Sequence, residues 1–194
     1  MKAIAISQRV DFHSNQKETR DTLDQSLIRL LVYCGYLPVP VPNKLEGTLR
    51  AWLFKVQPTA IVLSGGNDLG QSAIRDETEC ALLDYAQEKQ LPALGICRGM
   101  QLMAFWAGVS LHPVKGHVGK RHKLLGKIAR EVNSFHNFSL ATCPNDFEVL
   151  ALSEDREIEA IRHLSLLWEG WMWHPERESQ FMDEDIIRIR DLFG

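Results

Sequence analysis

The stretch Gly95-Ile96-Cys97-Arg98-Gly99-Met100-Gln101 follows the short apolar run Leu91-Pro92-Ala93-Leu94. This order predicts a strand, a sharp turn and a helix, so the side chain at the turn projects out of the sheet. Small residues on either side of Cys97 let other backbone approach it, and the Arg98 amide would lie at a helix N-terminus. Peptide dipoles there favour a thiolate and a developing oxyanion. Cys97 is therefore a candidate nucleophile; the glycines disfavour the alternative of a buried structural cysteine.

Strands and helices alternate on both sides of this turn. Apolar runs predict strands at 2–7, 60–63 and 91–96, and an extended segment at 37–41. Apolar residues at helical spacing predict helices at 18–34, 49–56, 74–90 and 98–108. The predicted fold class is therefore α/β, a three-layer sandwich with a mostly parallel central sheet and helices on both faces.

The second half of the chain changes character. Strand-like segments separated by short turns are expected at 127–132, 147–152, 157–162 and 166–173. Some of these strands are predicted to be antiparallel. Apolar residues between 183 and 193 predict a closing helix, and no linker divides the chain.

Composition limits the function classes. A length of 194 residues predicts one domain, 1–194, and the net charge of −3 indicates no surface for nucleic acid or membrane. No apolar stretch has the length of a signal peptide or membrane span, so a cytoplasmic location is expected. The four cysteines lack CxxC spacing and are interpreted as reduced thiols. His112, His117 and His122 match no standard metal-ligand spacing, so no metal site is predicted.

A cysteine nucleophile needs a base and a group that orients the base. His174 ends an apolar run and is followed by Pro175 and Glu176. Residues two apart in an extended segment project to the same side, so Glu176 can hold the His174 imidazole in the tautomer that accepts the thiol proton. The alternative is a surface histidine beside a solvated carboxylate.

Two glycines offer a second element of the site. Gly65 and Gly66 follow the predicted strand 60–63, and the carboxyl ends of parallel strands share one edge of the sheet. A backbone N–H from this loop could face the oxyanion that develops beside Cys97. A simple tight turn is the alternative interpretation of these glycines.

Together, Gly95-Ile96-Cys97-Arg98-Gly99-Met100-Gln101 and His174-Pro175-Glu176 resemble the motifs of the class I glutamine amidotransferase superfamily, over essentially the whole chain. The resemblance implies one flavodoxin-like domain with Cys97 as nucleophile, His174 as base and then acid, and Glu176 as the orienting carboxylate. It also implies an oxyanion hole from the amides of Gly66 and Arg98, with Gln101 holding the γ-glutamyl group.

Three further segments narrow the resemblance: Leu63-Ser64-Gly65-Gly66-Asn67-Asp68, Val132-Asn133-Ser134-Phe135-His136-Asn137 and Trp171-Met172-Trp173-His174-Pro175-Glu176-Arg177. They are similar to γ-glutamyl hydrolases, including the γ-glutamyl-γ-aminobutyrate and the smaller γ-glutamyl-CDP-amidate hydrolases. This resemblance makes His136 and Asn137 candidates for substrate contact; a polar turn between strands is the alternative. The basic segment 115–123 could meet an anionic leaving group, or be a solvated loop.

The expected activity is hydrolysis of a γ-glutamyl amide through a thioester on Cys97, without cofactor or metal. The expected partner is a small-molecule γ-glutamyl substrate, and a homodimer is one compatible assembly. A glutaminase subunit that supplies ammonia to a separate synthase has the same triad and is the first alternative. A non-catalytic protein that senses a γ-glutamyl metabolite is the second.

Overall fold

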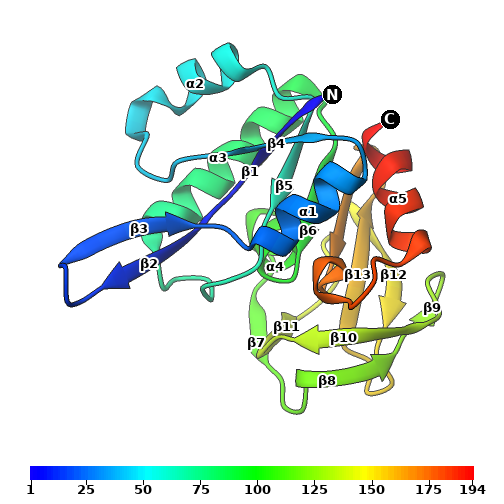
Figure 1. The fold of residues 1–194 in the computed structure, drawn as a ribbon. Helices are drawn as coiled ribbons and strands as arrows, with labels where there is room; N and C mark the ends of the chain where they lie inside the picture. The colour runs from blue at the N-terminus through cyan, green and yellow to red at the C-terminus, as the bar shows by residue number, and fades with distance from the viewer.

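The computed structural model describes all residues, 1–194, and is built around an eight-stranded sheet (Figure 1). In spatial order the strands are β4 (Leu37–Pro40), β1 (Ala3–Ile6), β5 (Ala60–Leu63), β6 (Ala93–Ile96), β14 (Trp168–Trp171), β13 (Ile158–His163), β12 (Phe147–Leu152) and β9 (Leu125–Gly126). The first five pair in parallel and the last three join antiparallel. The parallel strands follow the 2-1-3-4-5 order of flavodoxin-like folds, which confirms the predicted fold class.

Helices cover both faces of the sheet. On one face lie α1 (Gln25–Tyr33) and α5 (Asp183–Phe193), and on the other lie α2 (Leu49–Val56), α3 (Ala73–Lys89) and α4 (Arg98–Trp106). Alternation along β1 explains the two cores, because Ile4 and Ile6 pack with α1 and α5 while Ala5 packs on the opposite side. No helix combines the length and the apolar character needed to cross a bilayer.

Three two-stranded ribbons flank the sheet. They pair β2 (Arg9–His13) with β3 (Glu18–Thr22), β8 (Val118–Lys123) with β10 (Glu131–Phe135), and β7 (Leu111–Pro113) with β11 (Phe138–Leu140). The β2–β3 hairpin projects away from the sheet (Figure 1). Single 3-10 turns at η1 (Glu46–Thr48) and η2 (Pro175–Arg177) complete the chain.

The predicted helix 18–34 is wrong over its first part. Residues 18–22 form β3, and α1 begins only after Asp24, whose side chain accepts a hydrogen bond of 2.8 Å from the Ser26 N–H. An aspartate cap of this kind fixes a helix start. The sequence of β3, Glu-Thr-Arg-Asp-Thr, has no apolar face to bury, so its pairing with β2 decides its structure.

The stretch around the basic segment also differs from the prediction. Residues 118–123 form β8, not a loop, because the exposed segment is held by its ladder with β10. The predicted strand 127–132 is wrong as well, because the chain turns between β9 and β10. In this turn the Ile128 N–H donates to the Leu150 carbonyl at 3.0 Å, and this single hydrogen bond takes the place of a strand ladder.

Close packing of backbone fixes the turn between β6 and α4. A Cβ placed on Gly99 would lie 2.2 Å from the Leu63 carbonyl oxygen, and one on Gly95 would lie 2.5 Å from the Gly99 carbonyl carbon. Neither contact can relax by rotating a side chain, because each involves backbone. The glycines on both sides of Cys97 therefore let α4 sit directly against the ends of β5 and β6.

Gly99→Ala tests this packing. The added methyl group would force β5 and α4 apart, so we expect the free energy of unfolding to fall by at least about 2 kcal/mol. The matched control is Gly47→Ala, because a Cβ at Gly47 meets nothing within 4 Å. Urea denaturation measures both variants. Equal stability of the two would contradict the close-packed turn.

Candidate active site

Cys97 lies at the turn that joins β6 to α4. Its φ is 52° and its ψ is −103°, so a residue with a side chain occupies a strained conformation. Its N–H donates to the Trp171 carbonyl at 2.6 Å, and the residue is only 7% exposed. The turn therefore holds the sulfur at the carboxyl end of the sheet, at the start of a helix.

His174 and Glu176 follow β14 and form a buried pair. The distance between His174 Nδ1 and Glu176 Oε1 is 2.6 Å. The backbone of His174 is clamped by Asn133, which accepts from its N–H at 2.9 Å and donates to its carbonyl at 2.8 Å. Gly65 packs against the ring, since a Cβ there would lie 2.6 Å from His174 Cε1. Glu176 thus occupies Nδ1 and leaves Nε2 for proton transfer.

The charge state of His174 depends on both neighbours. Burial lowers the pKa of its imidazole, but the hydrogen bonds and charges of Cys97 and Glu176 outweigh burial and raise the pKa to about 9. The imidazolium is therefore favoured beside a thiolate at neutral pH. A thiolate paired with an imidazolium is the reactive form of a cysteine nucleophile.

The loop after β5 presents a backbone donor to the same place. Gly66 has a φ of 119°, and its N–H has no acceptor in the protein. The carbonyls of Ser64 and Gly65 are tied back by Arg75 Nη2, at 2.8 and 3.0 Å. Arg98 is the first residue of α4, where N–H groups lack an acceptor within the helix. Two free N–H groups at these positions suit an oxyanion.

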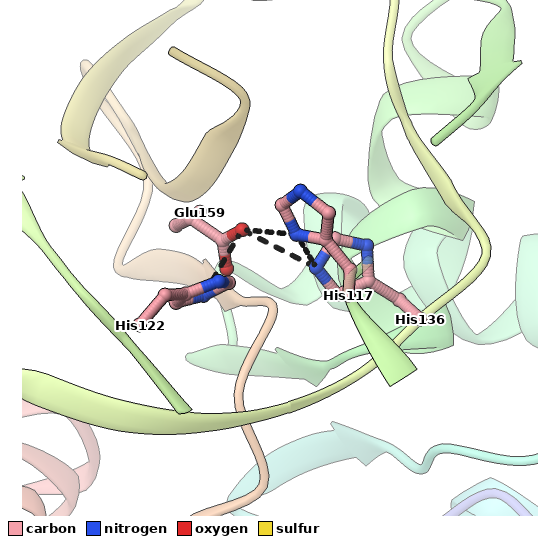
Figure 2. Close-up of side chains that lie close together, drawn as sticks. All are labelled: His117, His122, His136 and Glu159. Carbon is pink, nitrogen blue, oxygen red and sulfur yellow. Dashed lines mark hydrogen bonds and ion pairs between the residues drawn. The ribbon is translucent and has the colours of Figure 1, made fainter. Parts of the chain in front are cut away.

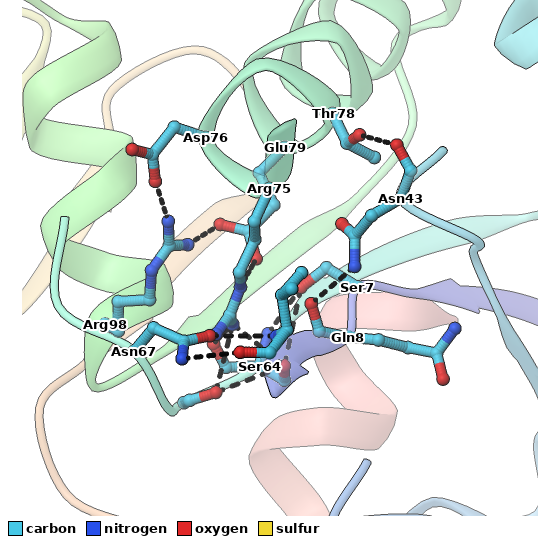
Figure 3. Close-up of polar contacts among 12 residues, drawn as sticks. Ser7, Gln8, Asn43, Ser64, Asn67, Arg75, Asp76, Thr78, Glu79 and Arg98 are labelled. Atoms are coloured by element: carbon cyan, nitrogen blue, oxygen red, sulfur yellow. Dashed lines mark hydrogen bonds and ion pairs between the residues drawn. The ribbon is translucent and has the colours of Figure 1, made fainter. Parts of the chain in front are cut away.

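Sequence reasoning missed the buried charges behind this loop (Figure 3). Arg75 and Glu79, both fully buried, form an ion pair of 2.8 Å, and the Arg98 guanidinium pairs with Asp76 and Glu79. The side chain of Arg98 thus turns into α3 while its amide stays at the helix start. The only signal in the sequence was the i, i+4 spacing of Arg75 and Glu79, which exposed surface pairs share.

The other predicted contact residues have different environments. Gln101 is buried, and its Nε2 donates to the Phe138 carbonyl at 3.0 Å. His136 is 2% exposed, and its Nδ1 lies 3.0 Å from the same carbonyl. Asn137 is exposed on the turn between β10 and β11. The structure therefore groups Gln101 and His136 around one carbonyl and leaves Asn137 apart from them.

Comparison with known proteins identifies the class. Residues 17–190 match the family described as Glutamine amidotransferase class-I, and the chain belongs to this family. It is 31% identical over 194 residues to a gamma-glutamyl-CDP-amidate hydrolase of Campylobacter jejuni, covering 95% of each chain.

More distant relatives share the same fold. The chain is 31% identical over 158 residues to a subunit of the glutamine-hydrolyzing GMP synthase of Methanocaldococcus jannaschii, covering 76% of this chain and 79% of the relative. The structure of a GMP synthase subunit from Thermoplasma acidophilum superposes with a TM-score of 0.74 at 21% identity. That superposition covers 100% of this chain and 93% of the other.

Glu79→Gln tests the buried charge network. Removing the carboxylate leaves two buried guanidinium groups short of a partner, so we expect a loss of about 3–5 kcal/mol in the free energy of unfolding. Glu77→Gln, on the same helix outside the buried network, is the control and should change stability little. Chemical denaturation separates the outcomes. A Glu79→Gln variant as stable as the control would show that the network does not support the loop.

NMR titration tests the charge state of His174. We expect its pKa near 9 in the unmodified protein, and a lower pKa in Cys97→Ala, because burial then meets less opposition. The imidazolium should therefore lose its proton at a lower pH in the variant. His163, whose pKa is lowered by burial, is the internal control and should titrate identically in both proteins. An unchanged His174 pKa would show that Cys97 and His174 form no thiolate–imidazolium pair.

Proposed function

We propose that the chain hydrolyses a γ-glutamyl amide by nucleophilic catalysis at Cys97. The observation that carries the proposal is the buried arrangement of Cys97, His174 and Glu176 at the carboxyl ends of β6 and β14. The Cys97 thiolate attacks the γ-carbonyl carbon, and the carbonyl π electrons move to oxygen. The N–H groups of Gly66 and Arg98 stabilise that oxyanion.

Collapse of the tetrahedral intermediate breaks the C–N bond. The imidazolium of His174 donates its proton to the leaving nitrogen, which departs as an amine or amidate and leaves a γ-glutamyl thioester on Cys97. Neutral His174 then takes a proton from water, the hydroxide attacks the thioester, and glutamate leaves as the thiolate is restored. Glu176 keeps the ring oriented through both steps.

For the substrate, we propose γ-glutamyl-CDP-amidate, cleaved to glutamate and cytidine diphosphoramidate in the synthesis of capsule phosphoramidate. The similarity to the Campylobacter jejuni hydrolase over 95% of both chains supports this choice. A cavity of about 270 Å³ also borders the Gly65–Gly66 loop and Glu176, and Arg9 and Arg177 line it. Guanidinium groups at that position suit a diphosphate leaving group.

A second candidate is a glutaminase subunit that delivers ammonia to a synthase. The similarity to the Methanocaldococcus jannaschii GMP synthase subunit favours it. The two functions use the same chemistry and differ in their requirement for a partner. A hydrolase should turn over alone, whereas the glutaminase subunit should depend on its synthase. γ-Glutamyl-γ-aminobutyrate is a third substrate to compare because it lacks the diphosphate.

The experiment offers the purified protein glutamine, γ-glutamyl-γ-aminobutyrate and γ-glutamyl-CDP-amidate separately and measures glutamate release. We expect a clear preference for the CDP-amidate without any partner. In Cys97→Ala we expect turnover to fall by at least about 10³-fold, with circular dichroism unchanged. Cys80→Ala, a partly buried thiol outside the site, should retain activity.

Two results would reject parts of this proposal. Activity on glutamine alone, and only after a synthase is added, would favour the glutaminase subunit. Turnover by Cys97→Ala equal to that of the unmodified protein would remove Cys97 as the nucleophile.

A further inference from the structure

Four side chains converge beneath the β8–β10 ribbon, away from Cys97 in the chain (Figure 2). His117 precedes β8, His122 lies on β8, His136 follows β10, and Glu159 lies on β13. Their nearest ring nitrogens and a carboxylate oxygen all lie within 4.8 Å of one another. Glu159 is fully buried, His117 and His136 are nearly so, and His122 is partly exposed. Three imidazoles and a carboxylate thus share one small buried volume.

Hydrogen bonds on the outer side of the rings orient lone pairs into this volume. The Phe138 carbonyl lies 3.0 Å from His136 Nδ1, so Nδ1 donates and the Nε2 lone pair of the neutral ring points inward. Asp155 Oδ2 lies 2.9 Å from His117 Nε2, so the Nδ1 lone pair of that ring points inward. Metal-binding histidines are commonly oriented by a carbonyl or carboxylate on the outer nitrogen.

The inward atoms lack a hydrogen to share. His117 Nδ1 and His136 Nε2 are 3.1 Å apart, and Glu159 Oε1 is 3.5 and 3.2 Å from them. With neutral rings, these three atoms face one another as electron-pair donors and repel unless a cation lies between them. His122 Nε2 and Glu159 Oε2 are buried atoms with no hydrogen-bond partner. Unpaired buried polar atoms are rare in folded proteins, and these two belong to the same cluster.

The spacing suits a tetrahedral metal ion. Bonds of about 2.0–2.2 Å from Zn²⁺ to nitrogen and oxygen place neighbouring ligand atoms about 3.3–3.5 Å apart. The contacts among these four residues, from 3.1 to 3.5 Å, agree with that spacing. Imidazole-rich sets favour zinc over magnesium or calcium. We propose that His117, His122, His136 and Glu159 bind one Zn²⁺ ion in a four-coordinate site.

The site would join the ribbon to the central sheet. Its ligands come from the segments around β8 and β10 and from β13, so the ion would tie three separate parts of the chain together. Asn133 on β10 clamps the backbone of His174, and the Phe138 carbonyl binds both His136 and Gln101. Four protein ligands leave no open position, so the metal has a structural role. Zinc would hold the wall of the active site in place and take no part in the chemistry.

The test uses the full chain without a histidine tag, stripped with chelator and then incubated with Zn²⁺ alone. After gel filtration, mass spectrometry of the metal content should give one Zn²⁺ per chain, and the melting temperature should be higher with zinc than without it. His122→Gln and His136→Gln should retain less than about a tenth of a zinc ion per chain. The control is His112→Gln, because His112 pairs with a carboxylate, Glu157, outside the cluster. It should bind zinc fully.

Cobalt gives a second reading that does not depend on any variant folding. Co²⁺ bound to the unmodified protein should show the intense visible absorption of tetrahedral coordination by nitrogen and oxygen. The proposal is overturned if the unmodified protein retains no zinc, if zinc stays bound in a folded His122→Gln variant, or if the cobalt complex is octahedral. In the first case the cluster holds a shared proton in place of a metal.

Discussion

The turn at Cys97 holds a residue with a side chain at a φ of 52°, a conformation that costs on the order of 1–3 kcal/mol. Backbone contact between Gly99 and Leu63 and the hydrogen bond from Cys97 to Trp171 fix this turn against β5 and β14. Because His174 follows β14 and Gly66 follows β5, the same contacts deliver a base and an oxyanion donor to the sulfur. The sheet therefore assembles the site as a consequence of its own packing.

Charge distribution supports that geometry from behind. Arg75 holds the carbonyls of the glycine loop and interacts favourably with the negative charge of a Cys97 thiolate. Arg98 anchors its side chain on Asp76 and Glu79, which keeps the guanidinium away from the amide that faces the substrate. Burial of these groups has a cost in desolvation that their mutual pairing offsets. The loop is thus fixed from its outer side, and its free N–H groups face the nucleophile.

The sequence predicted the parallel strands, the elbow and the spacing of His174 and Glu176, because each depends on local pattern or on sheet topology. It did not predict β3, whose residues have no apolar face and depend on pairing with β2. The histidine cluster was also missed, because the sequence spacing of His117 and His122 says nothing of Glu159, which arrives from β13. Contacts between distant segments decide these features, and no periodicity within either segment records them.

The central claim is that Cys97 is the thiolate that attacks a γ-glutamyl carbonyl. The most direct measurement is labelling by a glutamine-analogue electrophile, located by peptide mass spectrometry. We expect one adduct per chain, on Cys97, with Cys34, Cys80 and Cys143 unmodified and with much slower labelling in His174→Ala. An adduct on another cysteine, or no adduct on Cys97, would contradict it.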